Sequence, residues 1–76
     1  MNEIKINYLG KIINGENIGW FILIKDDRKI SGGFLIIISP NLDFSNIAYD
    51  SWVSNIDDLE KYFSESKWNI EWFKEE

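Results

Sequence analysis

The chain has 76 residues, of which 45% are hydrophobic and 16% aromatic, and its formal net charge at neutral pH is −5. This length allows one compact domain with one hydrophobic core and excludes a second domain. The composition excludes a disordered chain, because disordered chains are poor in hydrophobic residues. We therefore expect a single folded domain over residues 1–76.

Neither cysteine nor histidine occurs in the chain. These absences exclude disulfides, thiolate chemistry, sulfur-ligated zinc, and the commonest metal ligand and general base. The acidic residues do not follow a hydrolase or calcium-loop pattern, and no glycine-rich loop opens a helix to hold phosphate. Asp43, Ser45 and Asp50 could chelate a cation, but a solvated loop is the favoured interpretation. We expect no enzyme activity, no metal and no cofactor.

The start of the chain, Met1 to Ile6, lacks the basic residues and unbroken apolar core of a signal peptide. No fully apolar run is longer than that of Phe34 to Ile38, which is far shorter than the roughly 20 residues that cross a bilayer. The absence of cysteine suits a reducing compartment. We expect a soluble cytoplasmic protein that does not bind a membrane.

Negative charge is concentrated in the second half of the chain. Residues 1–38 carry four acidic and five basic side chains, a net charge of +1, whereas residues 39–76 carry nine acidic and three basic side chains, a net charge of −6. Nucleic-acid phosphates are bound mainly by lysine and arginine, so this balance argues against direct nucleic-acid binding. A basic protein is the partner that such a charge attracts.

Alternating apolar residues predict strands in the first half of the chain. We expect an edge strand at Glu3–Leu9, a turn at Asn14-Gly15, and an antiparallel hairpin formed by Ile18–Lys25 and Ile30–Ser39 around a polar turn. Both faces of this hairpin are apolar, which is typical of strands at the centre of a sheet. Gly32-Gly33 indicates a bulge or a place where a neighbour packs close to the backbone.

A short strand, a helix and a final strand are expected in the second half. Tyr49–Val53 is a possible strand, and Ser54 or Asn55 is a plausible N-cap for a helix that ends at about Ser66. Ile56, Leu59 and Phe63 share the inner face of this helix, and Trp68 to Phe73 alternates as the last strand. The predicted fold is α+β, an antiparallel sheet of four to five strands with one helix on one face, in the order β-β-β-(β)-α-β.

One helix of about 11 residues covers only one face of a sheet, so the second apolar face of the hairpin needs another cover. Three covers are open: the loop Asn41–Tyr49, a second copy of the chain in a homodimer, or a bound target. Tryptophan is frequent among residues that anchor interfaces. Core positions are favoured for Trp20, Trp68 and Trp72, whereas core and anchor are evenly balanced for Trp52.

The acidic residues from Asp50 to Glu65 can be interpreted as a solvated helix face or as a recognition surface. Five acids in this stretch stand against one base, Lys61, and concentrated negative charge of this kind accelerates association with basic partners. We favour the recognition surface.

Four segments, GGFLIIIS at 32–39, DSWV at 50–53, DLEKYF at 58–63 and WNIEW at 68–72, lie within residues 18–73. In style, this part of the chain resembles the small acidic immunity proteins that bacteria encode beside polymorphic or contact-dependent toxins. Such proteins bind a cognate toxin, often a nuclease with a basic active site, and block it with an acidic surface. The resemblance implies that acidic side chains here mimic phosphate and that an aromatic residue is a packed anchor. The partner-binding set is Asp50, Trp52, Asp57, Asp58, Glu60, Tyr62 and Glu65, with Trp52 or Tyr62 as the anchor.

The leading hypothesis is a non-catalytic inhibitor, an immunity protein or antitoxin that occludes a basic toxin domain. This chain is shorter than that class and only modestly acidic, which leaves the activity of the toxin open. Two alternatives stay open: a structural or adaptor module that self-associates through the uncovered sheet face, and a phage-encoded inhibitor of a host nucleic-acid enzyme.

Overall fold

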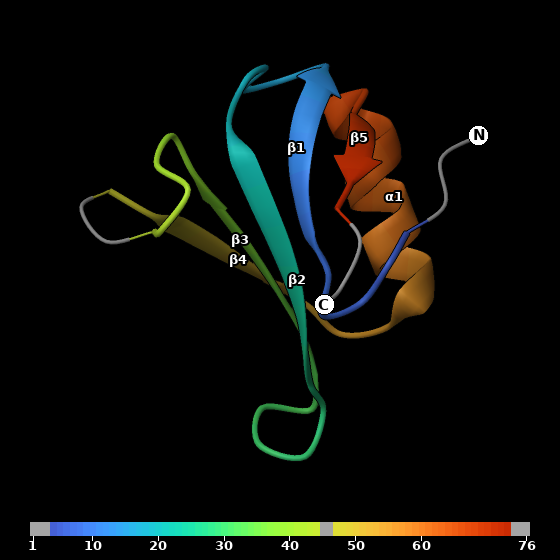
Figure 1. Cartoon of the computed structure of the whole chain (residues 1–76). Helices are drawn as coiled ribbons and strands as arrows, with labels where there is room; N and C mark the ends of the chain where they lie inside the picture. Colours follow the sequence, from blue (N-terminus) through green and yellow to red (C-terminus); the bar gives the residue numbers. More distant parts are fainter. Residues whose placement is uncertain (1–3, 45–46, 74–76) are drawn as a thin grey trace.

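The computed structural model describes residues 4–44 and 47–73, which form a five-stranded antiparallel sheet and one helix (Figure 1). The elements are β1 (Leu9–Asn14), β2 (Phe21–Asp27), β3 (Gly33–Ser39), β4 (Tyr49–Val53), α1 (Ile56–Ser66) and β5 (Asn69–Trp72). Their order in the sheet is β4-β3-β2-β1-β5. The predicted α+β fold and the element order are therefore confirmed, with the optional fourth strand present.

The central hairpin of β2 and β3 forms as the sequence predicts, with shorter strands. The two strands pair without interruption from Phe21 opposite Ser39 to Asp27 opposite Gly33. The strand β2 starts later than predicted because residues 16–19 form a turn, in which Gly19 has a φ of 91°. Ile30, predicted to begin β3, lies in the hairpin turn and is 89% exposed.

The predicted edge strand at Glu3–Leu9 is wrong for its described part, since residues 4–8 form no strand. Asn7 adopts the left-handed conformation, with a φ of 65°, which interrupts extended backbone. The first strand is instead Leu9–Asn14, and it lies between β2 and β5 inside the sheet. The beginning of the predicted strand, residues 1–3, is outside the described residues.

The chain turns directly after the predicted Asn14-Gly15, with Asn14 still in β1 and the turn at residues 16–19, and Gly15 brings the end of β1 against the end of the helix. Gly15 has a φ of 99°, and a side chain there would meet the main chain at Ser66 and Lys67. The indole N–H of Trp68 donates to the carbonyl oxygen of Glu16 at 2.7 Å. Only glycine combines this conformation with so close an approach.

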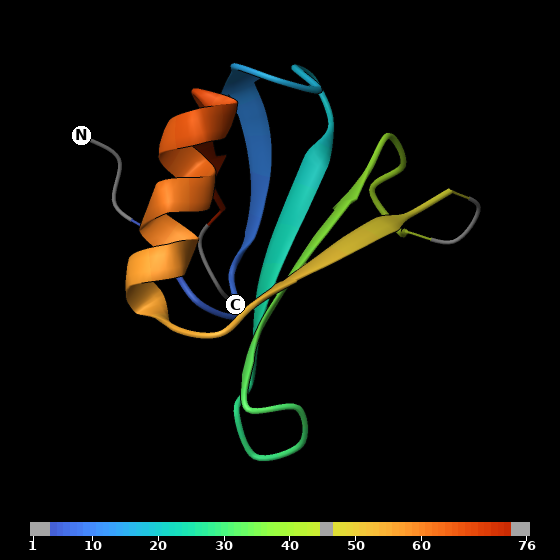
Figure 2. The ribbon, with the colours of Figure 1, turned by 180° about the vertical axis from the view of Figure 1, so that it is seen from behind.

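The helix α1 is capped at both ends and lies on the inner face of the sheet, beside β1 and β5 (Figures 1 and 2). Asn55 is the N-cap, and its side-chain oxygen accepts from the backbone N–H of Asp58 at 2.8 Å. Lys67 ends the helix in the left-handed conformation. Ile56, predicted to face inward, is 45% exposed, because it lies beside an open groove on the helix instead of over the sheet.

Apolar side chains of the inner face and the helix form the core. Its buried members are Ile12, Ile22, Ile24, Phe34, Ile36, Val53, Leu59, Phe63, Trp68 and Ile70. Trp20 and Trp72 are partly buried against this cluster, so the three tryptophans assigned to the core do pack there.

The outer face of the sheet has no helix of the described residues over it, as the prediction of a single helix implies (Figure 1). Its central side chains, Leu9, Phe21, Leu23, Leu35 and Ile37, are half-buried. The loop after β3 covers one corner, where the hydroxyl of Ser39 donates to the Ile47 carbonyl and accepts from the Asn41 N–H. Over the rest of the outer face, these half-buried side chains form the surface of the sheet.

Candidate protein-binding surface

The seven predicted binding residues lie in three places around α1 and β4. All five carboxylates among them are exposed, and they belong to Asp50, Asp57, Asp58, Glu60 and Glu65. No ion pair between described residues involves any of these five. The predicted surface is thus acidic and accessible, but it is not a single patch.

The pairing of β4 with β3 decides which side chains of β4 face outward. Val53 pairs with the core residue Phe34, so Val53 points to the inner face. Side chains alternate along a strand, which places Trp52 and Asp50 on the outer face. These two residues therefore lie on the opposite side of the sheet from the helix.

Trp52 is a partly exposed aromatic residue in a fixed position. Its indole N–H donates to the hydroxyl of Ser31 at 2.8 Å, and its side chain is 49% exposed. The ring packs so closely on Gly33 that a Cβ atom there would lie 2.7 Å from two ring carbons. The Gly32-Gly33 pattern thus marks a close approach and not a bulge, and Trp52 is the most exposed of the four tryptophans.

Asp58, Tyr62 and Glu65 form the flank of α1 that lies toward β4. The hydroxyl of Tyr62 is 2.9 Å from the hydroxyl of Ser51 on the inner face of β4. The Tyr62 ring also packs on Trp68, with 5.6 Å between ring centroids, so this residue is half-buried. Asp58 accepts a hydrogen bond from the Ser54 hydroxyl at 2.9 Å, which stabilises the start of the helix. Glu65 is exposed on the same flank.

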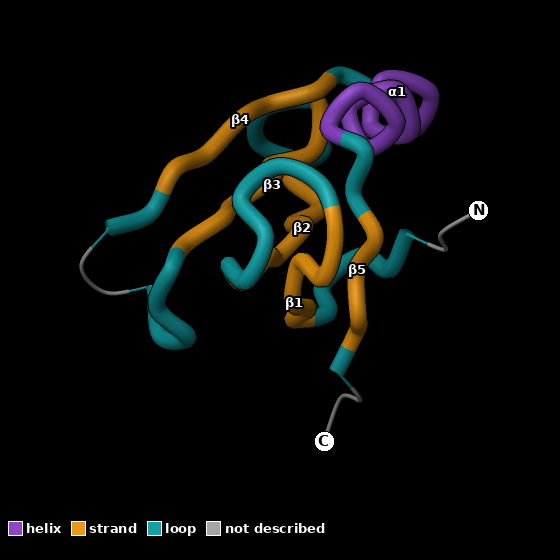
Figure 3. The backbone as a smooth tube through the Cα atoms, turned by 90° about the horizontal axis from the view of Figure 1, so that it is seen from above, coloured by secondary structure: helices purple, strands orange, loops and turns teal. Residues whose placement is uncertain are grey.

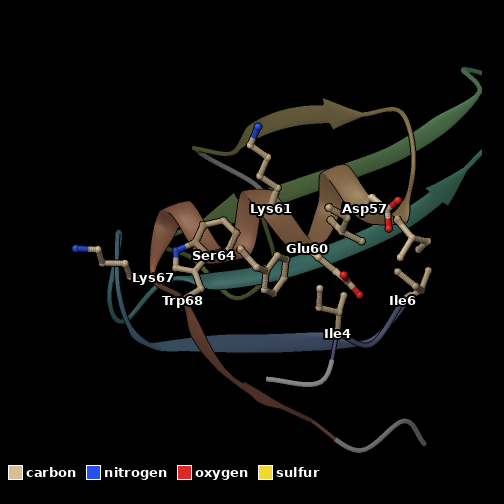
Figure 4. Close-up of a pocket in the computed structure, with 11 residues that line it drawn as sticks. Ile4, Ile6, Asp57, Glu60, Lys61, Ser64, Lys67 and Trp68 are labelled. Carbon is tan, nitrogen blue, oxygen red and sulfur yellow. The ribbon is translucent and has the colours of Figure 1, made fainter. Parts of the chain in front are cut away.

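Asp57 and Glu60 lie on the other flank of α1, beside a groove of about 890 Å³ (Figure 4). The N-terminal segment forms the opposite wall with Ile4 and Ile6, toward which the Glu60 carboxylate points. The helix residues Ile56, Leu59, Lys61, Phe63 and Ser64 also line the groove, as do Lys67 and Trp68, which follow the helix. The groove is apolar at its floor and mixed in charge at its rim.

The ion pair between Arg28 and Asp26 lies away from these surfaces, where the end of β2 meets the β2–β3 turn. The guanidinium of Arg28 approaches the carboxylate to 2.7 Å. This hydrogen bond holds the pKa of Asp26 below its ordinary value, and Asp26 raises the pKa of Arg28. Both groups are exposed, so the pair is a minor contribution to stability.

Residues 4–44 and 47–73 contain no group of three or more carboxylates placed to hold a metal ion. No helix within these ranges has the length and apolar character that crossing a membrane needs.

Fold and surface together define a small α+β domain with an acidic helix and an exposed tryptophan. Comparisons of this chain with protein-family models, with characterised proteins and with solved structures found no match. The groove residues Ile4 and Ile6 and the partner of Trp52, Ser31, were absent from the predicted set. Their roles depend on tertiary packing, which leaves no local signal in the sequence.

Proposed function

We propose that this chain is a non-catalytic inhibitor that binds a basic protein, and that it acts as an immunity protein or antitoxin by occluding a toxin. The observation that carries the proposal is the set of five exposed carboxylates on α1 and β4, none of which forms an ion pair with a base among the described residues. Such a surface attracts a basic active-site region and repels acidic competitors. The resemblance of residues 18–73 to immunity proteins supports the same function.

The test uses the protein encoded by the neighbouring gene as the partner. We expect that co-expression with this chain restores growth to cells that the neighbour poisons. We also expect association that slows as salt is added, because salt screens exposed charges over about 10 Å at 0.1 M. A neighbour that is harmless and does not bind this chain contradicts the proposal.

A charge-reversal variant connects this binding to the acidic surface. Asp57→Lys, Glu60→Lys and Glu65→Lys together should lower the association rate constant by about tenfold or more at low salt. Asp58 is left unchanged because its carboxylate accepts a hydrogen bond at the helix start. The control reverses Glu16 and Glu71, which are exposed elsewhere, and should have a smaller effect. Equal rates for the two variants would show that the helix charges do not steer the partner.

Self-association remains the second candidate, and the uncovered outer face of the sheet favours it. The apolar residues Leu23, Leu35 and Ile37 are only half-buried there. Sedimentation of the purified chain distinguishes the two: a tight dimer that buries this face and leaves α1 free supports an adaptor module. The gene neighbourhood distinguishes a bacterial immunity protein from a phage-encoded inhibitor.

A further inference from the structure

The strand β4 is an open edge of the sheet (Figure 3). All five of its residues pair with β3 in one uninterrupted register, from Tyr49 to Val53. The other edge, β5, has four residues, and its pairing with β1 shifts register between Ile12 and Asn14. Bulges and short strands are common protections of an edge, and β4 has neither.

Hydrogen bonds elsewhere in the sheet show which main-chain groups of β4 point outward. The carbonyl of Leu9 accepts a hydrogen bond from the N–H of Phe73. The N–H and C=O groups of alternate residues of β1, starting at Leu9, therefore point toward β5. Gly10 and Ile12 consequently face β2, in agreement with the bond from the Ile12 N–H to the Trp20 carbonyl.

The same alternation extends across β2 and β3 to β4. The main-chain N–H and C=O groups of even-numbered residues of β2 point toward β1, and the hydrogen bond from the Asn7 N–H to the Ile24 carbonyl agrees with this. Those of the odd-numbered residues consequently point toward β3. In β3 the even-numbered residues then face β4, where they bond Tyr49, Ser51 and Val53. The N–H and C=O groups of Asp50 and Trp52 are left pointing away from the sheet. No backbone bond from these two residues to another described residue competes for these groups.

Negative charge lies on both sides of this edge. The Asp50 side chain is on the outer face, and Asp58 and Glu65 project from the helix flank that Tyr62 holds against the inner face of β4. Exposed aromatic surface accompanies the charge, since Trp52 is 49% exposed on the outer face and Tyr49 is 58% exposed on the inner face. A strand added here would therefore meet carboxylates and aromatic rings on both of its faces.

We infer that β4 binds an extended, basic segment of a protein partner, which adds to the sheet as a sixth strand. The inference rests on the proposed function in one respect: the segment belongs to the protein that this chain inhibits. Main-chain hydrogen bonds to Asp50 and Trp52 would provide part of the affinity, and side chains at alternate positions would provide the specificity. Lysine or arginine at those positions would lie beside Asp50 on one face and would be attracted on the other by Asp58 and Glu65, which outnumber the one base between them, Lys61.

Charge also selects this occupant over a second copy of the chain. An antiparallel pair of β4 strands related by a two-fold axis at Ser51 would bring two sets of Asp50, Asp58 and Glu65 to one seam. Like charges across a seam oppose pairing, whereas a basic strand is attracted by the same groups.

The experiment uses a short, end-capped peptide of alternating lysine and valine with the full-length chain labelled with ¹⁵N. We expect the amide protons of Asp50 and Trp52 to become protected from hydrogen exchange and their resonances to shift. A peptide of alternating glutamate and valine should bind at least about tenfold more weakly. So should a lysine–valine peptide that is N-methylated at alternate residues along its hydrogen-bonding edge, because it cannot donate to β4.

Variants of Asp50 separate the main-chain contribution from the charge. Asp50→Pro removes the outward N–H and the carboxylate, and an edge position tolerates proline. Asp50→Asn removes only the charge. We expect Asp50→Pro to weaken peptide binding about tenfold beyond Asp50→Asn at both low and high salt. If Asp50→Pro does not fold, the N-methylated peptide tests the same hydrogen bonds on the unchanged chain.

Several results overturn the inference. They are shifts confined to the groove beside Asp57 and Glu60, equal binding of the N-methylated peptide, and protection of β4 amides that grows with protein concentration without peptide. The last would identify a second copy as the occupant. A chain that neutralises its toxin equally well with Asp50→Pro keeps the proposed function and loses the sixth strand. If the lysine–valine peptide binds specifically at β4 but the chain neutralises no toxin, the sixth strand is supported and the proposed function is lost.

Discussion

The close packing of the Trp52 ring on Gly33 predicts that adding one methyl group, in Gly33→Ala, lowers the stability of the fold strongly. In Gly33→Ala the new Cβ would lie 2.7 Å from the Cε2 and Cζ2 atoms of Trp52, and closer still to the carbonyl oxygen of Val53. Real Cβ atoms essentially never approach other atoms within 3.0 Å. Rotation of the indole cannot relieve the contact with the main chain, so β3 and β4 must move apart.

The cost of this movement follows from the contacts that it breaks. Overpacking costs about 1–3 kcal/mol, and loss of a main-chain hydrogen bond beside the pair of Phe34 and Val53 adds about 1 kcal/mol. The total of about 2–4 kcal/mol corresponds to a Tm lower by roughly 10–30 °C in a domain of this size. A domain of this length is stable by only about 4–11 kcal/mol.

The neighbouring Gly32 is the matched control. It has a φ of 87°, and a Cβ there would meet nothing within 4 Å. The only cost expected for Gly32→Ala is therefore the strain of the left-handed backbone, about 1–2 kcal/mol, with a Tm lower by roughly 4–16 °C.

Thermal unfolding followed by circular dichroism measures both effects, and the indole N–H resonance of Trp52 reports its bond to Ser31. We expect this resonance to move in Gly33→Ala and to stay in Gly32→Ala. Equal Tm values for the two variants, with an unmoved Trp52 resonance, would refute the close packing of Trp52 on Gly33.

Three further predictions concern the helix cap, the core and the β2–β3 turn. Asn55→Ala removes the acceptor for the Asp58 N–H and should lower the free energy of unfolding, measured with denaturant, by about 1 kcal/mol. Asn55→Asp keeps an acceptor at this position and should retain most of that stability. Leu59→Ala, at a fully buried position, should cost about 2–5 kcal/mol in the same measurement, and a value below about 1 kcal/mol would contradict its place in the core. In an NMR titration, Arg28→Gln should raise the pKa of Asp26 toward its ordinary value. Because the pKa of Asp26 is lowered by folding, its contribution is present above the ordinary pKa and is lost as the pH falls through the folded value, so the two proteins should converge in stability at acid pH.

The sequence predicts the second half of the fold better than the first. The helix and its Asn55 cap follow from local signals, namely a polar cap before acidic residues and inner apolar residues at helical spacing. The central hairpin follows from two runs of bulky apolar residues that flank a polar turn, and the structure pairs these runs as predicted. Boundaries beside the turns are wrong because apolar residues such as Ile18 and Ile30 occur in turns, where they are 61% and 89% exposed.

The first strand was misplaced because its pattern is weak. In Leu9–Asn14 an inward position is taken by Gly10, which lacks a side chain and accommodates the ring of Trp72: a Cβ there would lie 2.8 Å from that ring. The preceding Ile4 and Ile6 alternate convincingly but lie beside the helix groove. Here tertiary packing outweighs the two-residue period.

The candidate surface was predictable in its charge but not in its arrangement. Exposure of the acidic residues follows from the cost of burying charge. Asp57 and Glu60 lie beside the groove, Asp58 and Glu65 lie on the helix flank toward β4, and Asp50 lies on the outer face of the sheet. This separation depends on the strand order, which local sequence does not specify. The outward main chain of Asp50 and Trp52 has the same origin, since β4 is an edge only because it is the terminal strand in the order β4-β3-β2-β1-β5.

The acidity around β4 resolves a conflict that an open edge creates. An unpaired strand with exposed aromatic residues invites pairing between identical chains. Carboxylates at Asp50, Asp58 and Glu65 oppose that pairing, and the same carboxylates attract a basic strand. Added salt weakens both effects, so it should lower affinity for a basic segment while favouring self-association. Opposite salt dependence of these two equilibria follows from one set of charges, and neither a neutral edge nor a mixed one would produce it.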